Sequence, residues 1–122
     1  MDITKMTPKT GRILQEDNNF LNIVDGKQTI HHESVAVAGI GEIANINGYH
    51  KVTVTSYGTG TAMINIQVSI DGDHWYQTCC FNNNENEGGC LDNINISGWK
   101  YLRCQVESVK DGSVTVVSNA VY

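Results

Sequence analysis

The sequence predicts an all-β protein: an antiparallel β-sandwich, jelly-roll or immunoglobulin-like, with an extended N-terminal arm. The chain has 122 residues, which is enough for one hydrophobic core. It contains 12 Ile, 12 Val and 10 Thr but 4 Leu and 5 Ala, and β-branched residues favour strands. Apolar and polar residues alternate in several segments, as in strands with one buried face. Turn dipeptides separate these segments at intervals of about ten residues, a spacing typical of a sandwich.

Residues 1–32 are expected to form the arm and residues 33–122 the sandwich domain. The first eleven residues contain the single proline and few apolar side chains, so they offer little to a core. Short apolar stretches follow within 12–24, and the hairpin-turn dipeptide Asp25-Gly26 closes them. Both a small hairpin and an irregular extended segment fit this part of the arm.

Three segments of the sandwich domain carry the clearest two-residue alternation. Within 64–70, Ile and Val alternate with Asn, Gln and Ser, and within 102–107, Leu, Cys and Val alternate with Arg, Gln and Glu. Val35 and Val37 alternate with small residues. Each segment is expected to bury one face between two packed sheets and to leave the other in water. The predicted strands are 34–38, 42–47, 49–57, 61–70, 74–81, 90–96, 99–108 and 113–121.

The segment 69–75 joins two predicted strands through the dipeptide Asp71-Gly72. Because glycine accepts the positive φ that a tight hairpin requires, this segment is predicted to be a turn. A calcium site that includes Asp71 and Asp73 is the alternative, but the alternating oxygen ligands and the closing glutamate of a calcium loop are missing. No metal site is therefore predicted.

Four aromatic residues lie next to predicted turns. Trp75 and Tyr76 follow the Asp-Gly turn, and Trp99 and Tyr101 follow the turn at Ser97-Gly98. Large aromatic side chains usually fill the core of a small sandwich, so both tryptophans are expected to be mostly buried. The alternative is an exposed platform on which sugar rings stack. In that case these four residues would be the ligand-binding residues of a carbohydrate-binding module.

The four cysteines, at positions 79, 80, 90 and 104, are expected to be reduced, because the sequence shows no secretory signal. Cys79 and Cys80 are adjacent, so they point to opposite faces of a strand, which argues against a four-cysteine zinc site. A disulfide between Cys80 and Cys90 is the alternative. Cys104 alternates with apolar residues and is expected to be a buried free thiol.

The histidines and potential nucleophiles form no recognisable catalytic motif. His31 and His32 are consecutive on an extended segment, so their side chains are expected to diverge into exposed or hydrogen-bonded positions. His50 is expected to be partly buried, and His74 lies in the predicted hairpin. The sequence indicates no strand–turn–helix elbow and no helix N-terminus for an oxyanion site. The chain is therefore predicted not to be an enzyme and to need no cofactor.

The charge and hydropathy of the chain exclude some classes of partner. Lys and Arg number 8 against 13 Asp and Glu, a net charge of −5, which argues against nucleic acid because phosphates require a basic surplus. No apolar run approaches the roughly 20 residues of a membrane span, and the start of the chain has no signal-peptide pattern. Neither nucleic acid nor membrane is predicted as a partner.

Two pairs of motifs resemble those of small structural proteins of tailed bacteriophages. The lead segments are TGRILQEDN at 10–18 and NIVD at 22–25. The second pair, SIDGDHW at 69–75 and GWKYLR at 98–103, is similar to a pattern in phage β-sandwich domains that decorate heads or form fibre and baseplate parts. Four cysteines depart from what is usual in such a domain.

This resemblance implies a non-enzymatic virion protein, such as a capsid decoration or head accessory protein, assembled in the host cytoplasm. Its partner would be the major capsid protein or another virion protein, bound through the N-terminal segment. Exposed edge strands also allow a homo-oligomer, for instance a trimer. The alternative function is a carbohydrate- or receptor-binding module of a tail, baseplate or fibre. The expected attachment residues are Arg12, Ile13, Leu14, Phe20, Leu21 and Ile23.

Overall fold

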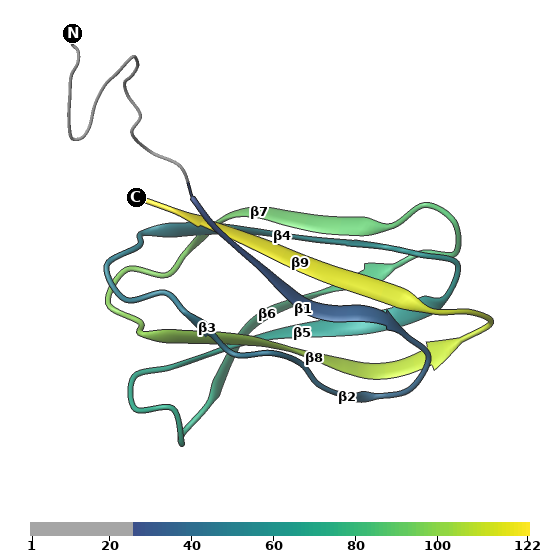
Figure 1. Cartoon of the computed structure of the whole chain (residues 1–122), viewed down its shortest axis with the longest axis horizontal. Coiled ribbons are helices and arrows are strands. Elements are labelled where there is room, and N and C mark those ends of the chain that lie inside the picture. Colours follow the sequence, from purple (N-terminus) through teal and green to yellow (C-terminus); the bar gives the residue numbers. More distant parts are fainter. Residues whose placement is uncertain (1–25) are drawn as a thin grey trace, which may run out of the picture.

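The computed structural model describes residues 26–122 and has two antiparallel sheets packed face to face (Figure 1). The predicted β-sandwich is confirmed. Within the described residues no helix has the length and apolar character of a transmembrane span. The strands are β1 (Lys27–Val35), β2 (Gly39–Ile40), β3 (Ala44–Asn45), β4 (Lys51–Tyr57), β5 (Thr61–Ser69), β6 (Tyr76–Asn83), β7 (Gly89–Asn95), β8 (Tyr101–Lys110) and β9 (Val114–Val121).

The two sheets have different strand orders. The first sheet runs β1-β9-β4-β7, and the second runs β2-β8-β5-β6, with the short β3 also paired to β8. The edge strands β1, β2 and β3 therefore lie along one side of the sandwich, while β6 and β7 lie along the other (Figure 1). At the centre of the second sheet, β5 pairs with β8 in antiparallel register along its whole length, from Thr61 opposite Lys110 to Ser69 opposite Tyr101.

The six strands predicted from residue 49 onward agree with β4 to β9 to within a few residues. The predicted strand 34–38 is wrong, because the chain forms β1 at Lys27–Val35 instead. Residues 27–32, which were assigned to the arm, pair with β9 in the first sheet. Register shifts on both sides of His32 disrupt the two-residue alternation of β1, so periodicity could not reveal this strand.

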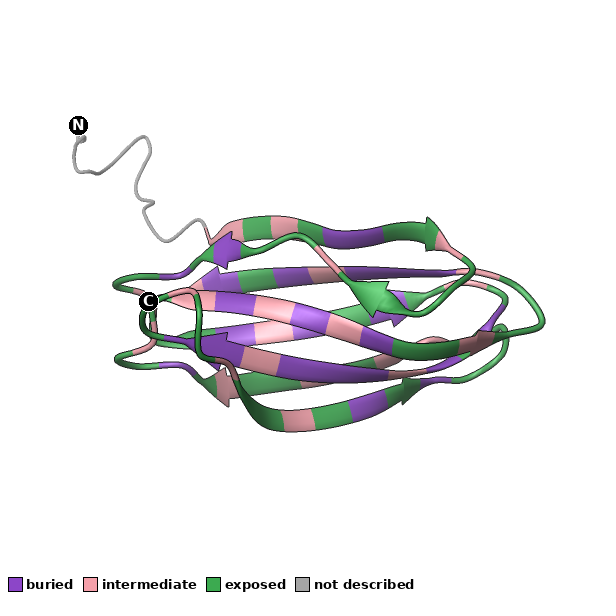
Figure 2. Cartoon of the chain, turned by 90° about the horizontal axis from the view of Figure 1, so that it is seen from below, coloured by how far each residue is buried: buried purple, intermediate pink, exposed green. Residues whose placement is uncertain are grey.

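The hydrophobic core fills the space between the sheets. Buried and exposed residues alternate along the long strands, as the bands in Figure 2 show. Cys104 is buried among apolar residues, as predicted. Fully burying a Val, Leu or Ile side chain contributes about 1.5–3 kcal/mol. The largest fully buried side chains are Ile46, Ile64, Ile66, Ile96, Leu102, Val52, Val54, Val68, Val106, Val114 and Val116.

Candidate functional site

The turn between β5 and β6 is organised by the carboxylate of Asp71. Asp71 Oδ1 accepts hydrogen bonds from the backbone N–H groups of Asp73 at 2.8 Å and His74 at 2.9 Å, and from Ser69 Oγ at 3.1 Å. Gly72 has a φ of 84°, as the glycine of a tight turn requires. The turn predicted from the Asp-Gly dipeptide is confirmed. The second carboxylate oxygen, Asp71 Oδ2, faces the side chain of His74.

Asp71 and His74 form a hydrogen-bonded ion pair at the surface. Asp71 Oδ2 lies 2.7 Å from His74 Nδ1. Hydrogen bonds from the backbone of His74 and Asp73, and from the His74 side chain, hold the pKa of Asp71 well below its usual range. The same contact and the charge of Asp71 raise the pKa of His74. Because Nδ1 binds the carboxylate, His74 Nε2 is left available to a ligand.

A pocket of about 520 Å³ opens between this turn and Trp99. The rings of Tyr76 and Trp99 lie 6.0 Å apart between centroids and are tilted by 45°. Ile70 is 58% exposed and Tyr76 is 59% exposed, so the pocket offers apolar surface to solvent. It is lined by Ile70, Asp71, His74, Tyr76 and Trp99.

Trp75 and Tyr101, the other two aromatic residues predicted as alternative ligands, are not among the residues that line the pocket. The Arg103 guanidinium lies 4.2 Å from the centroid of the Trp75 ring, and the Trp75 indole donates to the carbonyl of Gly72 at 3.2 Å. The Tyr101 ring lies near Gly72. Both side chains therefore support the turn.

The expectation that both tryptophans are mostly buried is confirmed, since Trp75 and Trp99 each keep only the smaller part of their surface in solvent. Trp99 also packs against the core. Each lies in a turn that leads into a strand, Trp75 before β6 and Trp99 before β8. Sequence reasoning missed Ile70, Asp71 and His74 as pocket residues, although their place in the hairpin turn next to Tyr76 was the available signal.

A second surface lies on the side formed by the edge strands β1 and β2. A shallow groove of about 530 Å³ there is lined by Ile30, His31, His32, Glu33, Val35, Ile40, Gly41 and Glu42. Exposed apolar side chains occur along the same stretches of chain. They are Ile30, Val37, Ile40 and Ile43.

The side chains of His31 and His32 are buried beneath this side of the sandwich. Their exposed fractions are 4% and 7%, and the expected divergence of the two side chains is wrong. The bulge in β1 places an additional residue between Ile30 and His32, which lets consecutive side chains point inward. The expected hydrogen bonding is confirmed, since His32 Nε2 donates to the carbonyl of Cys104 at 2.9 Å. His50, expected to be partly buried, is exposed.

Three further predictions concern a disulfide, a metal site and the attachment residues of the arm. All four cysteines are free thiols, with Cys80 and Cys90 exposed, so the alternative of a disulfide between them is wrong. Within residues 26–122 no group of three or more His, Cys, Asp or Glu side chains could hold a metal ion. The predicted attachment residues Arg12, Ile13, Leu14, Phe20, Leu21 and Ile23 lie outside the described residues.

Comparison with known proteins identifies similar folds. No protein-family model matches the sequence, and no curated protein matches it. The crystal structure of SPBc2 prophage-derived protein YomS superposes with a TM-score of 0.67 at 21% identity, over 86% of this chain and 100% of YomS. The crystal structure of PBSX exported protein XepA superposes with a TM-score of 0.68 at 17% identity, over 92% of this chain and 41% of XepA. The chain thus has the fold of YomS and of less than half of XepA.

Proposed function

We propose that this chain is a phage-encoded, non-enzymatic virion protein, a capsid decoration or head accessory protein. The observation that carries the proposal is the fold, which matches the prophage-derived protein YomS over its full length. The phage-like motifs at 10–18, 22–25, 69–75 and 98–103 are independent support from the sequence. The partner is the major capsid protein or another protein of the particle.

The side of the sandwich formed by β1 and β2 is the proposed attachment surface. Val37 and Ile40 expose apolar side chains there, and exposed apolar groups in a row favour contact with another protein. Edge strands also present unpaired backbone groups that a neighbouring chain can bind. β1 is the first strand of the described residues, and the proposed attachment residues at 12–23 precede it in the sequence.

Retention of the chain on purified particles tests this function. Particles from the strain that carries the gene should contain the chain by mass spectrometry. The double variant Val37→Lys, Ile40→Lys should reduce retention of the chain on the particle without changing its melting temperature, because two charged side chains would lie in an apolar contact. Tyr57→Lys is the matched control, since Tyr57 is 58% exposed and lies on β4, a strand that pairs with neither β1 nor β2. Absence of the chain from particles, or equal loss in the control, contradicts the proposal.

A further inference from the structure

We propose that the pocket between the β5–β6 turn and Trp99 binds a neutral saccharide, with one pyranose ring stacked on its aromatic side chains. This binding site is separate from the proposed attachment surface, because its residues lie in the turn 70–75, at the start of β6 and before β8. A chain attached through β1 and β2 would leave the pocket open to a glycan outside the particle.

The size and lining of the pocket suit one or two sugar rings. Its volume of about 520 Å³ lies within the roughly 300–1,000 Å³ of small-molecule sites. Tyr76 and Trp99 supply two tilted rings, and the C–H face of a pyranose packs on such a ring much as another apolar group does. Ile70 extends the apolar surface beside them.

The exposure of these side chains distinguishes a binding site from a core. Ile70 and Tyr76 keep more than half of their surface in solvent, while Trp99 packs on the core with part of its ring. The core contact holds Trp99 in place and leaves the rest of the ring for a ligand. An aromatic and aliphatic cluster held in this way is a preformed apolar platform.

The polar rim of the pocket suits hydroxyl groups. His74 is oriented by its 2.7 Å contact with Asp71, and Asp71 is itself held by two backbone N–H groups. His74 Nε2 donates a hydrogen bond when the ring is protonated and accepts one when the ring is neutral and Nδ1 carries the proton. A sugar hydroxyl both accepts and donates, so it can bind either form.

The charges at the rim disfavour other ligand classes. A quaternary ammonium ion also stacks on aromatic rings, but a protonated His74 at the rim, paired with Asp71, would repel it. An inorganic anion would approach the same carboxylate and be repelled. A neutral sugar meets neither obstacle.

Titration of the full chain with methyl pyranosides tests the proposal. The probes are the methyl glycosides of glucose, galactose and N-acetylglucosamine, followed by NMR of the two tryptophan indole N–H groups. At least one probe should shift the Trp99 signal at millimolar concentration and leave the Trp75 signal in place, because Trp75 lies against Arg103. No shift with any pyranoside, or equal shifts at both tryptophans, overturns the proposal.

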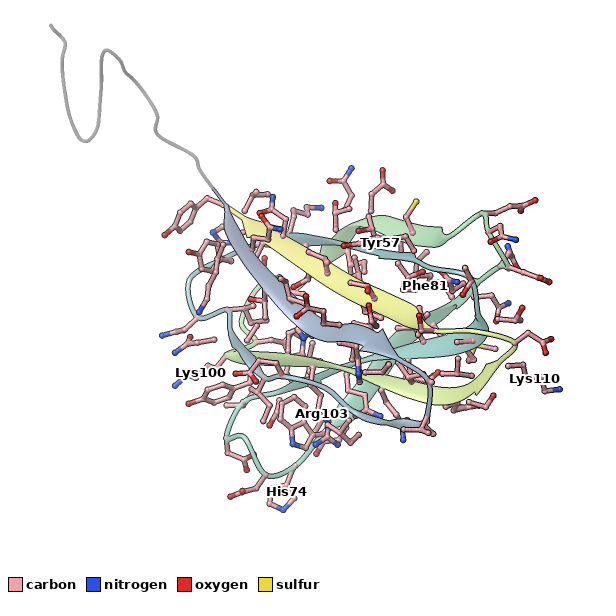
Figure 3. All side chains as sticks on the ribbon, turned by 45° about the vertical axis from the view of Figure 1, so that its right-hand side comes forward. Tyr57, His74, Phe81, Lys100, Arg103 and Lys110 are labelled. Carbon is pink, nitrogen blue, oxygen red and sulfur yellow. The ribbon has the colours of Figure 1, made fainter. Side chains whose placement is uncertain are left out.

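Substitutions in the pocket complete the test. Tyr76→Ala should weaken binding about tenfold, the effect of losing one aromatic contact, and His74→Ala should weaken it as well. Tyr57→Ala is the matched control, because Tyr57 has nearly the same exposure as Tyr76 and lies in the other sheet; Figure 3 shows it far from His74. Equal weakening in the control, or binding of tetramethylammonium or inorganic phosphate in place of every pyranoside, contradicts the assignment.

Discussion

The imidazole of His31 donates a hydrogen bond from Nδ1 to the carbonyl oxygen of Glu42 at 2.7 Å. His31 lies on β1, the edge of the first sheet, and Glu42 follows β2, the edge of the second sheet. The backbone N–H of Glu42 in turn donates to the carbonyl of His31 at 3.0 Å. With Nδ1 donating, Nε2 of the neutral ring accepts from Ser118 Oγ at 2.7 Å. One side chain therefore links both sheet edges and the neighbouring strand β9.

Replacing His31 with leucine should lower the free energy of unfolding by about 1–3 kcal/mol, since it leaves the buried hydroxyl of Ser118 and the part-buried carbonyl of Glu42 without this partner. Urea denaturation at neutral pH measures the change. His50→Leu is the control, because His50 is exposed and contacts only Ser97 Oγ, at 3.0 Å, through its ring. A loss in the control as large as that in His31→Leu would contradict the role of His31.

The stability of the domain should decline as the pH falls below 6.5. Burial lowers the pKa of His31 from its ordinary value of 6.5, so the unfolded chain takes up a proton that the native state resists. The contribution of His31 is therefore complete above 6.5 and is lost as the pH falls toward the lowered native pKa. Melting curves between pH 6.5 and about 5 should show this loss, and His31→Leu should make the decline smaller.

His74 contributes to the pH dependence with the opposite sign. Its pKa is raised by Asp71, so its stabilising contribution is present below 6.5 and is lost as the pH rises through the raised pKa. A decline between pH 6.5 and 5 that is unchanged in His31→Leu would show that another group causes it. The variant His74→Ala separates the two effects, since it should leave the decline below pH 6.5 in place.

Gly41→Ala should destabilise the domain by about 1–3 kcal/mol, the usual cost of overpacking. A Cβ at position 41 would collide with the carbonyl oxygen of His31 and would lie 2.6 Å from His32 Nε2. Gly39→Ala is a close control, because a Cβ at position 39 meets nothing within 4 Å. Thermal unfolding of both variants measures the difference, and equal melting temperatures would contradict the predicted collision.

The N-terminal boundary of the folded domain should lie before β1. A chain of residues 26–122 should unfold cooperatively, whereas residues 33–122 should lose much of their stability. The shorter chain lacks the pairing of Lys27 to Ile30 with β9 and the buried side chains of His31 and His32. Thermal melting followed by circular dichroism compares the two chains. Equal stability would show that residues 27–32 are not part of the folded domain and would contradict this prediction.

Cys104 should resist thiol reagents in the native protein. Its burial raises the pKa of the thiol to about 12, so very little reactive thiolate is present at neutral pH. Iodoacetamide should modify the exposed Cys80 and Cys90 and should modify Cys104 only after denaturation. Peptide mass spectrometry identifies the modified positions, and rapid native labelling of Cys104 would contradict its place in the core.

The sequence by itself determined the fold class and most of the strands. Ile64, Ile66 and Val68 alternate with polar residues, and they face the core as the two-residue period requires. The same period placed Cys104 in the core, and the Asp71-Gly72 dipeptide located the β5–β6 turn. These predictions succeeded because side-chain direction in a regular strand and φ in a tight turn are local properties of the chain.

Only the tertiary structure decided which residues meet at the two candidate surfaces. The bulge in β1 turns both His31 and His32 inward, and its position depends on the register with β9. Tyr76 and Trp99 are brought together because β6 and β8 both begin beside the end of β5. Trp75, next to Tyr76 in sequence, packs on Arg103 instead. Contacts between strands distant in sequence set these arrangements, and local periodicity carries no information about them.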